Sequence, residues 1–360
     1  MKLTRTFTYL LKSSFTLVLV CFGLCLNAQT TSQKLDSWLN ENTPDMGGRA
    51  VLMVYKNGKV VYTGSANSMS VGQKVTSRMI ARKQGKTADL QDYTVNTRVQ
   101  IASCSKWLSA ALVMTFVDEG KLKTTDTIGK YLPVLSKNGK GGITLSECLS
   151  HTTGIKAPGL RESLQDMKDI SSMDEAVAKI ATLPMEGVPG KVFNYSNVGL
   201  QLAGAVIEKI SGESFEQLFA ERIAKPLDMK NTDFGHNKVS LPAGGAYSTA
   251  EDYLNFLVMI LNKGTFKGKR LLSESSIKEM QINRITPDVK IAYSPAEAGA
   301  PGYGYGEWIT SGSVTSPGLF GSYPVVDNTK GYAAFLVTFY LKNKGKQQRY
   351  EELKKLLDTI

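Results

Sequence analysis

Ser103 and Lys106 form the first pair of residues in this chain whose types and spacing could do chemistry. They lie three positions apart where the long apolar run "SKWLSAALVMTF" begins, which predicts a helix on which both side chains share a face. A serine hydroxyl becomes nucleophilic when a base takes its proton, and a lysine can be that base when burial keeps part of it neutral. The backbone N–H of Ser103, near the helix N-terminus, could also stabilise an oxyanion. The pair therefore predicts acyl transfer from a carbonyl compound.

Neighbouring and look-alike residues set limits on this prediction. Ser275 and Lys278 have the same spacing, but there a polar helix begins, so ordinary capping explains them. Cys104 could be offered as the nucleophile instead, but adjacent helical positions point in different directions and no histidine is near in sequence. We therefore expect Cys104 to be a small core residue. Cys104 and Cys148 could form one disulfide or remain two buried thiols.

A second candidate set, Tyr195 and Asn197, lies in a loop before a helix rich in small residues, within "PGKVFNYSNVGLQLAGAVIEKISG". A tyrosine held near a buried ammonium can shuttle protons, and an asparagine amide can hold a substrate carbonyl. Tyr253 and Asn255 repeat the spacing inside an amphipathic helix, where packing is the simpler interpretation. The loop pair is therefore the stronger candidate.

The elements that must position these residues are predicted from both ends of the chain. The segment 49–66 contains two β-rich runs around Asn57-Gly58, which predicts a tight hairpin, and 318–328 and 331–343 are two further strands. Segments 31–42 and 349–360 have apolar residues at helical spacing. We expect an α+β fold: one antiparallel sheet from both termini covered by these two helices, with a mostly helical lobe inserted. The sheet lobe is predicted at 29–102 and 295–360, and the helical lobe at 103–294.

Repeated helix starts support a helical middle segment. Four pairs have the capping-box spacing: Thr144 with Glu147, Ser172 with Glu175, Ser214 with Gln217, and Ser248 with Glu251.

Taken together, seven segments resemble the class C β-lactamase-like serine hydrolases, which include D-alanyl-D-alanine carboxypeptidases, D-aminopeptidases and esterases. In chain order they are "IASCSK", "TIGKYLP", "ITLSECLSHTTGI", "FNYSNVGLQLAGAVIEKISG", "PLDMKNTDF", "GGAYSTAEDYLNFLVMILNKG" and "YGYGEW". The resemblance covers nearly the whole chain after residue 28. It implies a β-lactamase/transpeptidase-like fold with the active site between the two lobes.

The resemblance also implies roles for individual residues. Ser103 matches the acylated nucleophile and Lys106 the lysine that activates it. Tyr195 matches the tyrosine that serves as base or proton shuttle, and Asn197 the amide that contacts substrate. His151, in "LSHTTGI", matches a family histidine that we expect to be structural.

One family element is altered in this chain. Where the family has Lys or His, then Thr or Ser, then Gly, on the strand lining the cleft, the aligned residues are Ser316-Pro317-Gly318. Ser316 would supply a substrate-facing hydroxyl without charge, Gly318 would keep the close approach, and Leu319 N–H would be the second oxyanion donor. An alignment to Ser311-Gly312 fits the strand pattern less well. Loss of the cation favours esters or amides that lack a C-terminal carboxylate.

Residues 1–28 are predicted to be a signal peptide. Lys2, Arg5 and Lys12 precede an apolar run too short to span a bilayer comfortably, and cleavage is expected after Ala28. A retained anchor and a lipid-modified Cys25 are the alternatives. The remaining protein would be exported to the periplasm or secreted.

Charge and composition exclude several other functions. The formal net charge is +11, and +8 without the leader. Part of the excess lies in 73–86, which we interpret as a solvated surface insertion, with an anionic envelope surface as the second interpretation. No nucleic-acid motif, no closely spaced metal ligands and no G-x-S-x-G nucleophile elbow occur. We expect no metal or cofactor, and a small-molecule or peptide acyl substrate.

Two functions remain open from sequence. The first is an exported serine hydrolase that works through a Ser103 acyl-enzyme. The second is a binding or sensor module of the penicillin-binding type on the same fold, which acylates slowly or only binds. The altered Ser316-Pro317 segment motivates the second, and the sequence does not predict the oligomeric state.

Overall fold

The structure is a computed structural model that describes residues 31–83, 85–159, 162, 165, 169–235, 238–295, 302–342 and 344–360. The predicted leader, residues 1–28, lies outside these residues. Within the described ranges, no helix is long and apolar enough to cross a membrane.

A seven-stranded antiparallel sheet joins both ends of the chain, in the order β2-β1-β13-β12-β11-β10-β9. Its strands are β1 (Arg49–Lys56), β2 (Lys59–Asn67), β9 (Gly302–Tyr303), β10 (Trp308–Ile309), β11 (Ser313–Thr315), β12 (Tyr323–Asp327) and β13 (Tyr332–Thr338). Asn57 and Gly58 join β1 to β2 with φ of 52° and 82°, the left-handed pair that a two-residue hairpin requires. The predicted hairpin and terminal sheet are confirmed.

The remaining elements belong mainly to the middle of the chain. The helices are 31–42, α2 (Val71–Lys83), α3 (Ser105–Asp118), α4 (Pro133–Lys137), α5 (Leu145–Leu149), α7 (Met173–Thr182), α8 (Val198–Ser211), α9 (Phe215–Phe219), α10 (Ala250–Leu261), α11 (Glu274–Met280) and α12 (Lys346–Leu357). Short turns of helix are η1 (Thr43–Met46), η2 (Ala102–Cys104), η3 (Ile128–Lys130) and η4 (Ala220–Ala224). Two-stranded ladders are formed by β3 (Val99–Gln100) with β5 (Tyr247–Ser248), β4 (Val192–Asn194) with β8 (Lys290–Tyr293), and β6 (Thr265–Phe266) with β7 (Lys269–Arg270).

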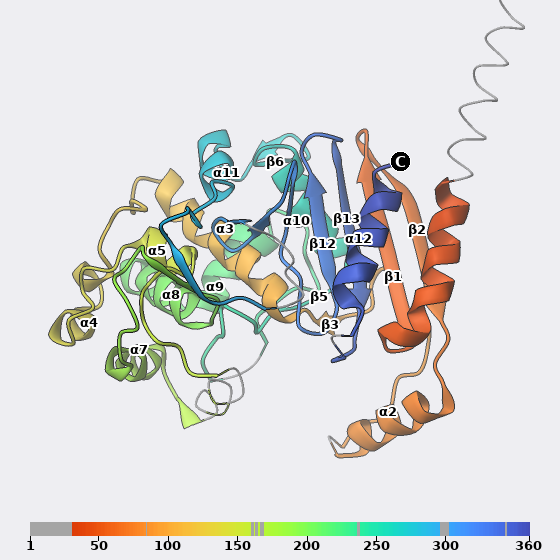
Figure 1. Cartoon of the computed structure of the whole chain (residues 1–360), viewed down its shortest axis with the longest axis horizontal. Helices are drawn as coiled ribbons and strands as arrows, with labels where there is room; N and C mark the ends of the chain where they lie inside the picture. Colours follow the sequence, from red (N-terminus) through yellow and green to blue (C-terminus); the bar gives the residue numbers. More distant parts are fainter. Residues whose placement is uncertain are drawn as a thin grey trace, which may run out of the picture.

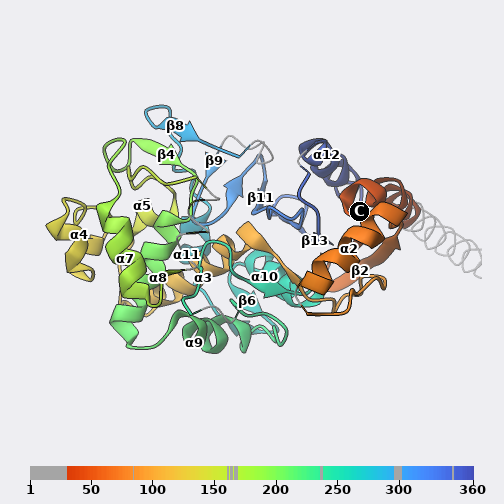
Figure 2. The same cartoon turned by 90° about the horizontal axis from the view of Figure 1, so that it is seen from below.

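Helices cover both faces of the sheet (Figures 1 and 2). Helix 31–42 and α12 cover one face, where Leu35 and Leu353 pack in one apolar cluster with Leu52. On the other face α10 lies against β13, and Tyr253 stacks on Phe335 with ring centroids 4.4 Å apart. We predicted the first two helices as cover, but not α10, because an amphipathic pattern does not say which neighbour its apolar face meets. The lobe boundaries at 102/103 and 294/295 stay a prediction.

α3 runs through the centre of the helical part and contacts α8, α9, α11 and η4. Every residue from Ser105 to Phe116 is buried, which explains why its sequence is apolar on all sides. Cys104 and Cys148 are both buried and free, so the alternative of two unbonded thiols holds.

Three of the four predicted helix caps have the expected geometry. Thr144 and Glu147 form a complete capping box, and Ser172 and Ser214 accept the backbone N–H three residues on. The fourth prediction was one residue off, because Thr249, not Ser248, caps α10 by accepting from Asp252 N–H. Both positions carry a hydroxyl followed three residues later by an acid, so the pattern alone could not separate them.

Candidate active site

Ser103 lies in the single turn η2 that leads without a break into α3. Its neighbour Ala102 has φ of 46°, a left-handed conformation that costs energy for a residue with a Cβ. Ser105, to which we assigned no role, stabilises this turn: its hydroxyl donates to Ala102 O at 2.5 Å and accepts from Ala246 N–H at 3.0 Å. Tyr253 Oη donates to Cys104 O at 2.8 Å. Ser103, the candidate nucleophile, therefore lies on a strained turn that these hydrogen bonds stabilise.

Lys106 is buried beneath Ser103, with a side chain that is 1% exposed. Its Nζ lies 3.3 Å from Ser103 Oγ, 3.4 Å from Asn197 Oδ1 and 2.7 Å from Ala243 O. Burial lowers the pKa of the Lys106 ammonium to about 7. A substantial fraction of this amine is therefore neutral near pH 7, with its lone pair within reach of the serine proton.

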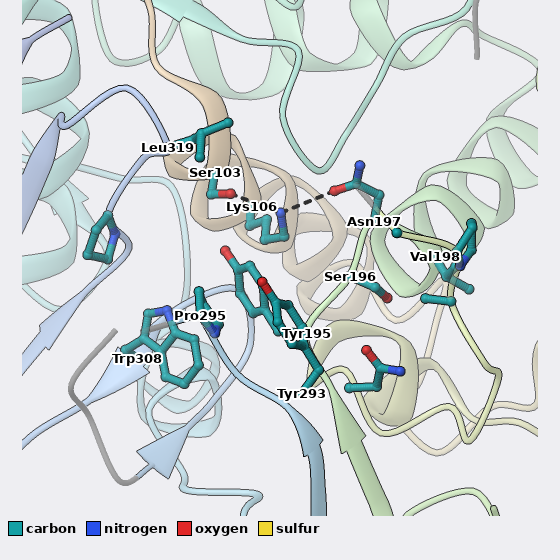
Figure 3. A pocket seen from close by; sticks show the side chains of 15 residues that line it. Ser103, Lys106, Tyr195, Ser196, Asn197, Val198, Tyr293, Pro295, Trp308 and Leu319 are labelled. Atoms are coloured by element: carbon teal, nitrogen blue, oxygen red, sulfur yellow. Dashed lines mark hydrogen bonds between the residues drawn. The ribbon is translucent and has the colours of Figure 1, made fainter. Parts of the chain in front are cut away.

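Tyr195 lies directly against this amine, since Lys106 Nζ is 4.7 Å from the centre of its ring. The ring stacks on Trp308 at 5.3 Å with an interplanar angle of 26°, and lies 4.7 Å from the ring of His151. In Figure 3 the Tyr195 side chain extends toward Ser103 and Lys106, and Tyr293 is a further aromatic residue of the cavity lining. The aromatic contacts hold Tyr195 in place beside the Ser–Lys pair.

His151 holds the loop that carries Tyr195. Its Nδ1 accepts from Ser196 N–H at 3.5 Å, and its Nε2 lies 3.1 Å from Tyr303 Oη. Burial, with Lys106 nearby, moves the pKa of His151 well below its usual value, so the ring is neutral at pH 7. Because Nδ1 accepts, Nε2 carries the proton and donates to Tyr303. This agrees with the structural role that we expected for His151.

Asn197 stands at the N-cap position of α8, beside Lys106. Its Oδ1 accepts from the lysine, so the amide nitrogen remains as the group that can donate to a substrate carbonyl. The α8 helix reaches this place because Gly199 packs on Cys148 O, where an added Cβ would lie 2.1 Å from that oxygen. Gly199 is one of the small residues in which the sequence of this helix is rich.

The segment after β11 forms another part of the cavity wall near Ser103, but the Ser316 side chain does not face this cavity. Its hydroxyl donates to Gly306 O at 2.9 Å and lies 3.3 Å from Ser103 O, and the residue is 1% exposed. The hydroxyl therefore contacts the backbone acceptors of Gly306 and Ser103 in this structure, and the substrate contact of Ser316 stays a prediction. Pro317 and Leu319 line the cavity instead.

Gly318 allows the segment after β11 to lie close to the turn that carries Ser103. A Cβ built on it would lie 2.3 Å from Ile101 O, so no larger residue fits without displacement. Its own N–H donates to Ser322 O at 2.8 Å. The N–H groups of Ser103 and Leu319 stay the two candidate oxyanion donors, and both residues line the cavity.

The residues around Ser103 enclose a cavity of about 370 Å³. Its described lining is Ser103, Lys106, Ala157, Pro158, Gly159, Asn194, Tyr195, Ser196, Asn197, Val198, Tyr293, Pro295, Trp308, Pro317 and Leu319. Lys106 is the one cation among these fifteen residues. The lining is otherwise aromatic, aliphatic or neutral polar.

Sequence reasoning missed two aromatic members of this lining. Trp308 belongs to the quoted segment "YGYGEW", which we treated as a family mark rather than as a cavity wall. Tyr293 reaches the site because β8 pairs in parallel with β4, the strand that precedes Tyr195. No local pattern predicts that pairing, since the two strands are far apart in sequence. Among the described residues no cluster of His, Cys, Asp and Glu could hold a metal ion.

Known proteins are similar to this chain in sequence and in fold. The Beta-lactamase family model matches residues 43–357. Protein Rv1367c of Mycobacterium tuberculosis is 27% identical over 283 residues, which is 63% of this chain and 70% of that protein.

Two solved structures have the same fold. A β-lactamase-like protein of Bacteroides dorei superposes with a TM-score of 0.73 at 27% identity, over 90% of this chain and 98% of that one. The D-amino acid amidase of Ochrobactrum anthropi superposes with a TM-score of 0.69 at 20% identity, over 92% and 98% of the two chains. The second likeness concerns the fold alone.

Proposed function

Because this chain belongs to the β-lactamase family of serine hydrolases, we propose that it cleaves an ester or amide through an acyl-enzyme on Ser103. The observation that carries this proposal is the buried Lys106 amine, 3.3 Å from Ser103 Oγ with its pKa lowered to about 7. A lysine in this state can accept the proton that makes the serine a nucleophile.

The proposed reaction begins when Ser103 Oγ attacks the substrate carbonyl carbon and passes its proton to neutral Lys106. The carbonyl oxygen becomes an oxyanion that accepts from Ser103 N–H and Leu319 N–H. As the tetrahedral intermediate collapses, the leaving alcohol or amine takes a proton from Tyr195, which regains one from the Lys106 ammonium. Water then attacks the acyl-enzyme with the same groups acting in reverse, which releases the acid and restores Ser103.

The lining favours a neutral acyl donor. Lys106 is the one described cation at the cavity, and its proposed role in proton transfer leaves no second cation among the described lining residues to hold a substrate carboxylate. Ser316, at the position where the family carries a charge or hydroxyl toward the cleft, turns its hydroxyl to backbone carbonyls. Trp308 and Tyr293 offer flat apolar contact to an acyl or alcohol group. Simple esters and uncharged amides are therefore the proposed substrates, ahead of β-lactams and of peptides ending in a D-amino-acid carboxylate.

A catalytically impaired penicillin-binding or sensor module on the same fold is the second candidate. The specific observation in its favour is the missing cation after β11, which in the family helps to hold substrate. Such a module would keep Ser103 acylated, or would bind without reaction.

One experiment separates the two candidates. The protein is incubated with p-nitrophenyl esters, D-amino-acid anilides, a chromogenic cephalosporin and a fluorescent penicillin, and product release and intact mass are followed. We expect rapid ester turnover, with kcat/KM for the cephalosporin lower by about 100-fold because its carboxylate lacks a partner. Ser103→Ala should lose both turnover and adduct, whereas Ser275→Ala, which has the same spacing to a lysine, should lose neither. A lasting adduct on Ser103, or no reaction with any compound, would favour the module.

We also propose that the protein is exported. The support is the basic start and short apolar run of residues 1–28. N-terminal sequencing of the protein from a bacterial envelope fraction should find Gln29 first. An intact Met1 in that fraction would contradict cleavage, and finding the protein only in the cytoplasmic fraction would contradict export.

A further inference from the structure

Helix α2 exposes apolar side chains that no other part of the described chain covers. None of its residues is buried. Among its apolar residues, Val71 is 80%, Val75 46% and Met79 58% exposed. Ile80 is 52% exposed as well. An isolated exposed apolar residue is ordinary, but four within ten positions of one helix form a patch.

The orientation of α2 turns most of this patch away from the protein. Gln73 Nε2 donates to Pro44 O at 2.9 Å, and Gln73 Oε1 accepts from Ser70 N–H at 2.7 Å, so the Gln73 side faces the body. Gln73, Ser77 and Ala81, four apart, are the partly covered residues of the helix. Val71, Val75 and Met79, also four apart, then lie on the outward side.

Only basic charges accompany the outward apolar residues. Lys74, Arg78, Arg82 and Lys83 lie within α2, Lys86 follows it, and 71–86 contains no Asp or Glu. Both views place α2 at the opposite end of the molecule from α4 and α7 (Figures 1 and 2). No residue of α2 lines the cavity at Ser103, so this surface is separate from the candidate active site.

A second exposed apolar pair lies at the same end of the sheet. Phe339 and Leu341, after β13, are 45% and 64% exposed, and Lys342 follows them. Gly47 packs on Phe339 O, and the next residue, Gly48, packs on the Gln73 side chain of α2. Gly47 and Gly48, which follow η1, thus lie between α2 and the segment that carries Phe339 and Leu341.

We infer that α2 binds the surface of an anionic lipid bilayer, with Val71, Val75 and Met79 entering the boundary between headgroups and acyl chains. Lysine and arginine stems can lie along that boundary while their charged ends reach lipid phosphates. A helix that carries both features on its outward side, without acidic residues, fits this surface better than the flat polar surface of a protein. The enzyme would then be held at a membrane while its cavity stays open to substrate.

The first test measures flotation of the full-length protein with vesicles. We expect binding to vesicles of phosphatidylglycerol and phosphatidylcholine that weakens with salt, and less binding to phosphatidylcholine alone. The triple variant K74Q/R78Q/R82Q should bind the anionic vesicles about 100-fold more weakly. V75S/M79S should reduce binding about tenfold. The matched control K123Q/K130Q/K137Q removes as many charges from the opposite end and should bind as the wild type does.

The second test reads α2 directly and does not depend on residues 1–30. Trypsin should cut after Arg78, Arg82 and Lys83 in the free protein, and anionic vesicles should protect these sites while cuts after Lys123 and Lys137 continue. Ester hydrolysis in solution should be unchanged in every α2 variant. Equal flotation of the α2 and control triples, unprotected α2 sites, or a changed oligomeric state of the α2 variants would each overturn the proposal.

Discussion

Helices α3 and α2 are nearly equal in length and contain similar residue types, yet they do opposite things. Both contain lysine, serine, valine and methionine. In α3 every residue from Ser105 to Phe116 is buried, whereas in α2 none is. Burial, rather than composition, lowers the pKa of the Lys106 amine to about 7, and exposure keeps the α2 cations available to an external surface.

The buried lysine of α3 and the exposed apolar residues of α2 also differ in their free-energy cost to the folded protein. A buried lysine without an acidic partner is expensive, and its retention in α3 makes sense if its neutral form is used. Exposed apolar residues on α2 cost little in the folded protein but favour association. Each helix therefore departs from the usual placement of its residues, and each departure indicates a different function.

Replacing the two lysines tests the comparison most strongly. Lys106→Ala should reduce kcat/KM for an activated ester by about 10² to 10⁴, because the serine loses its base. Lys74→Ala, the same change in α2, should leave kcat/KM unaltered. Steady-state hydrolysis with both variants measures this, and circular dichroism checks that each is folded. Wild-type activity in Lys106→Ala would remove the assignment of the base.

The pH profile should show the buried lysine. Below an apparent pKa of about 7, Lys106 is an ammonium and cannot accept the Ser103 proton, so kcat/KM should fall about tenfold per pH unit. Above that pH the profile should level. Burial moves the pKa of His151 well below its usual value, so this histidine does not cause the fall of kcat/KM below pH 7. A profile that is flat from pH 5 to 8 would contradict the role of Lys106.

Replacing two glycines should have a smaller effect on activity and tests the position of the proposed oxyanion donor. Gly318→Ala should lower kcat by about 10- to 100-fold, because the new Cβ would lie 2.3 Å from Ile101 O and would displace Leu319 N–H. In Gly72→Ala of α2 the new Cβ would meet Ser70 Oγ only at 4.0 Å, an ordinary van der Waals contact, so activity and thermal stability should be kept. Kinetics and thermal melts of the two variants give the comparison, and equal kcat values would argue against Leu319 as an oxyanion donor.

The smallest effect is expected from Ser316→Ala. Its hydroxyl contacts the backbone carbonyls of Gly306 and Ser103, so we expect kcat to fall by less than about tenfold with KM nearly constant. Ser77→Ala in α2 is the matched serine control. A large rise in KM for Ser316→Ala alone would instead indicate direct substrate contact, as the sequence first suggested.

Sequence patterns predicted what depends on local spacing. The hairpin at Asn57-Gly58 follows from a dipeptide, and the Ser103–Lys106 proximity follows from one turn of helix. Tyr195 and Asn197 joined them through a resemblance, because no spacing rule brings residues about ninety positions away to the same lysine.

Other features were out of reach of sequence for physical reasons. The direction of the Ser316 hydroxyl depends on two backbone carbonyls, at Gly306 and Ser103, that only the folded chain brings together. Tyr293 enters the cavity through a parallel pairing between distant strands. The exposure of α2 is likewise a tertiary property, since its apolar residues could equally have met a partner within the chain.

The buried thiol of Cys104, the residue after Ser103, can report whether the site has opened. Burial raises the pKa of Cys104, and its Sγ lies 3.7 Å from Ser322 O, so thiol reagents cannot attack it while the turn and the wall after β11 stay together. Cys148 is shielded in the same way, but by α8. The order in which the two thiols become labelled under mild denaturation therefore records whether the junction between sheet and helices separates before the helices themselves.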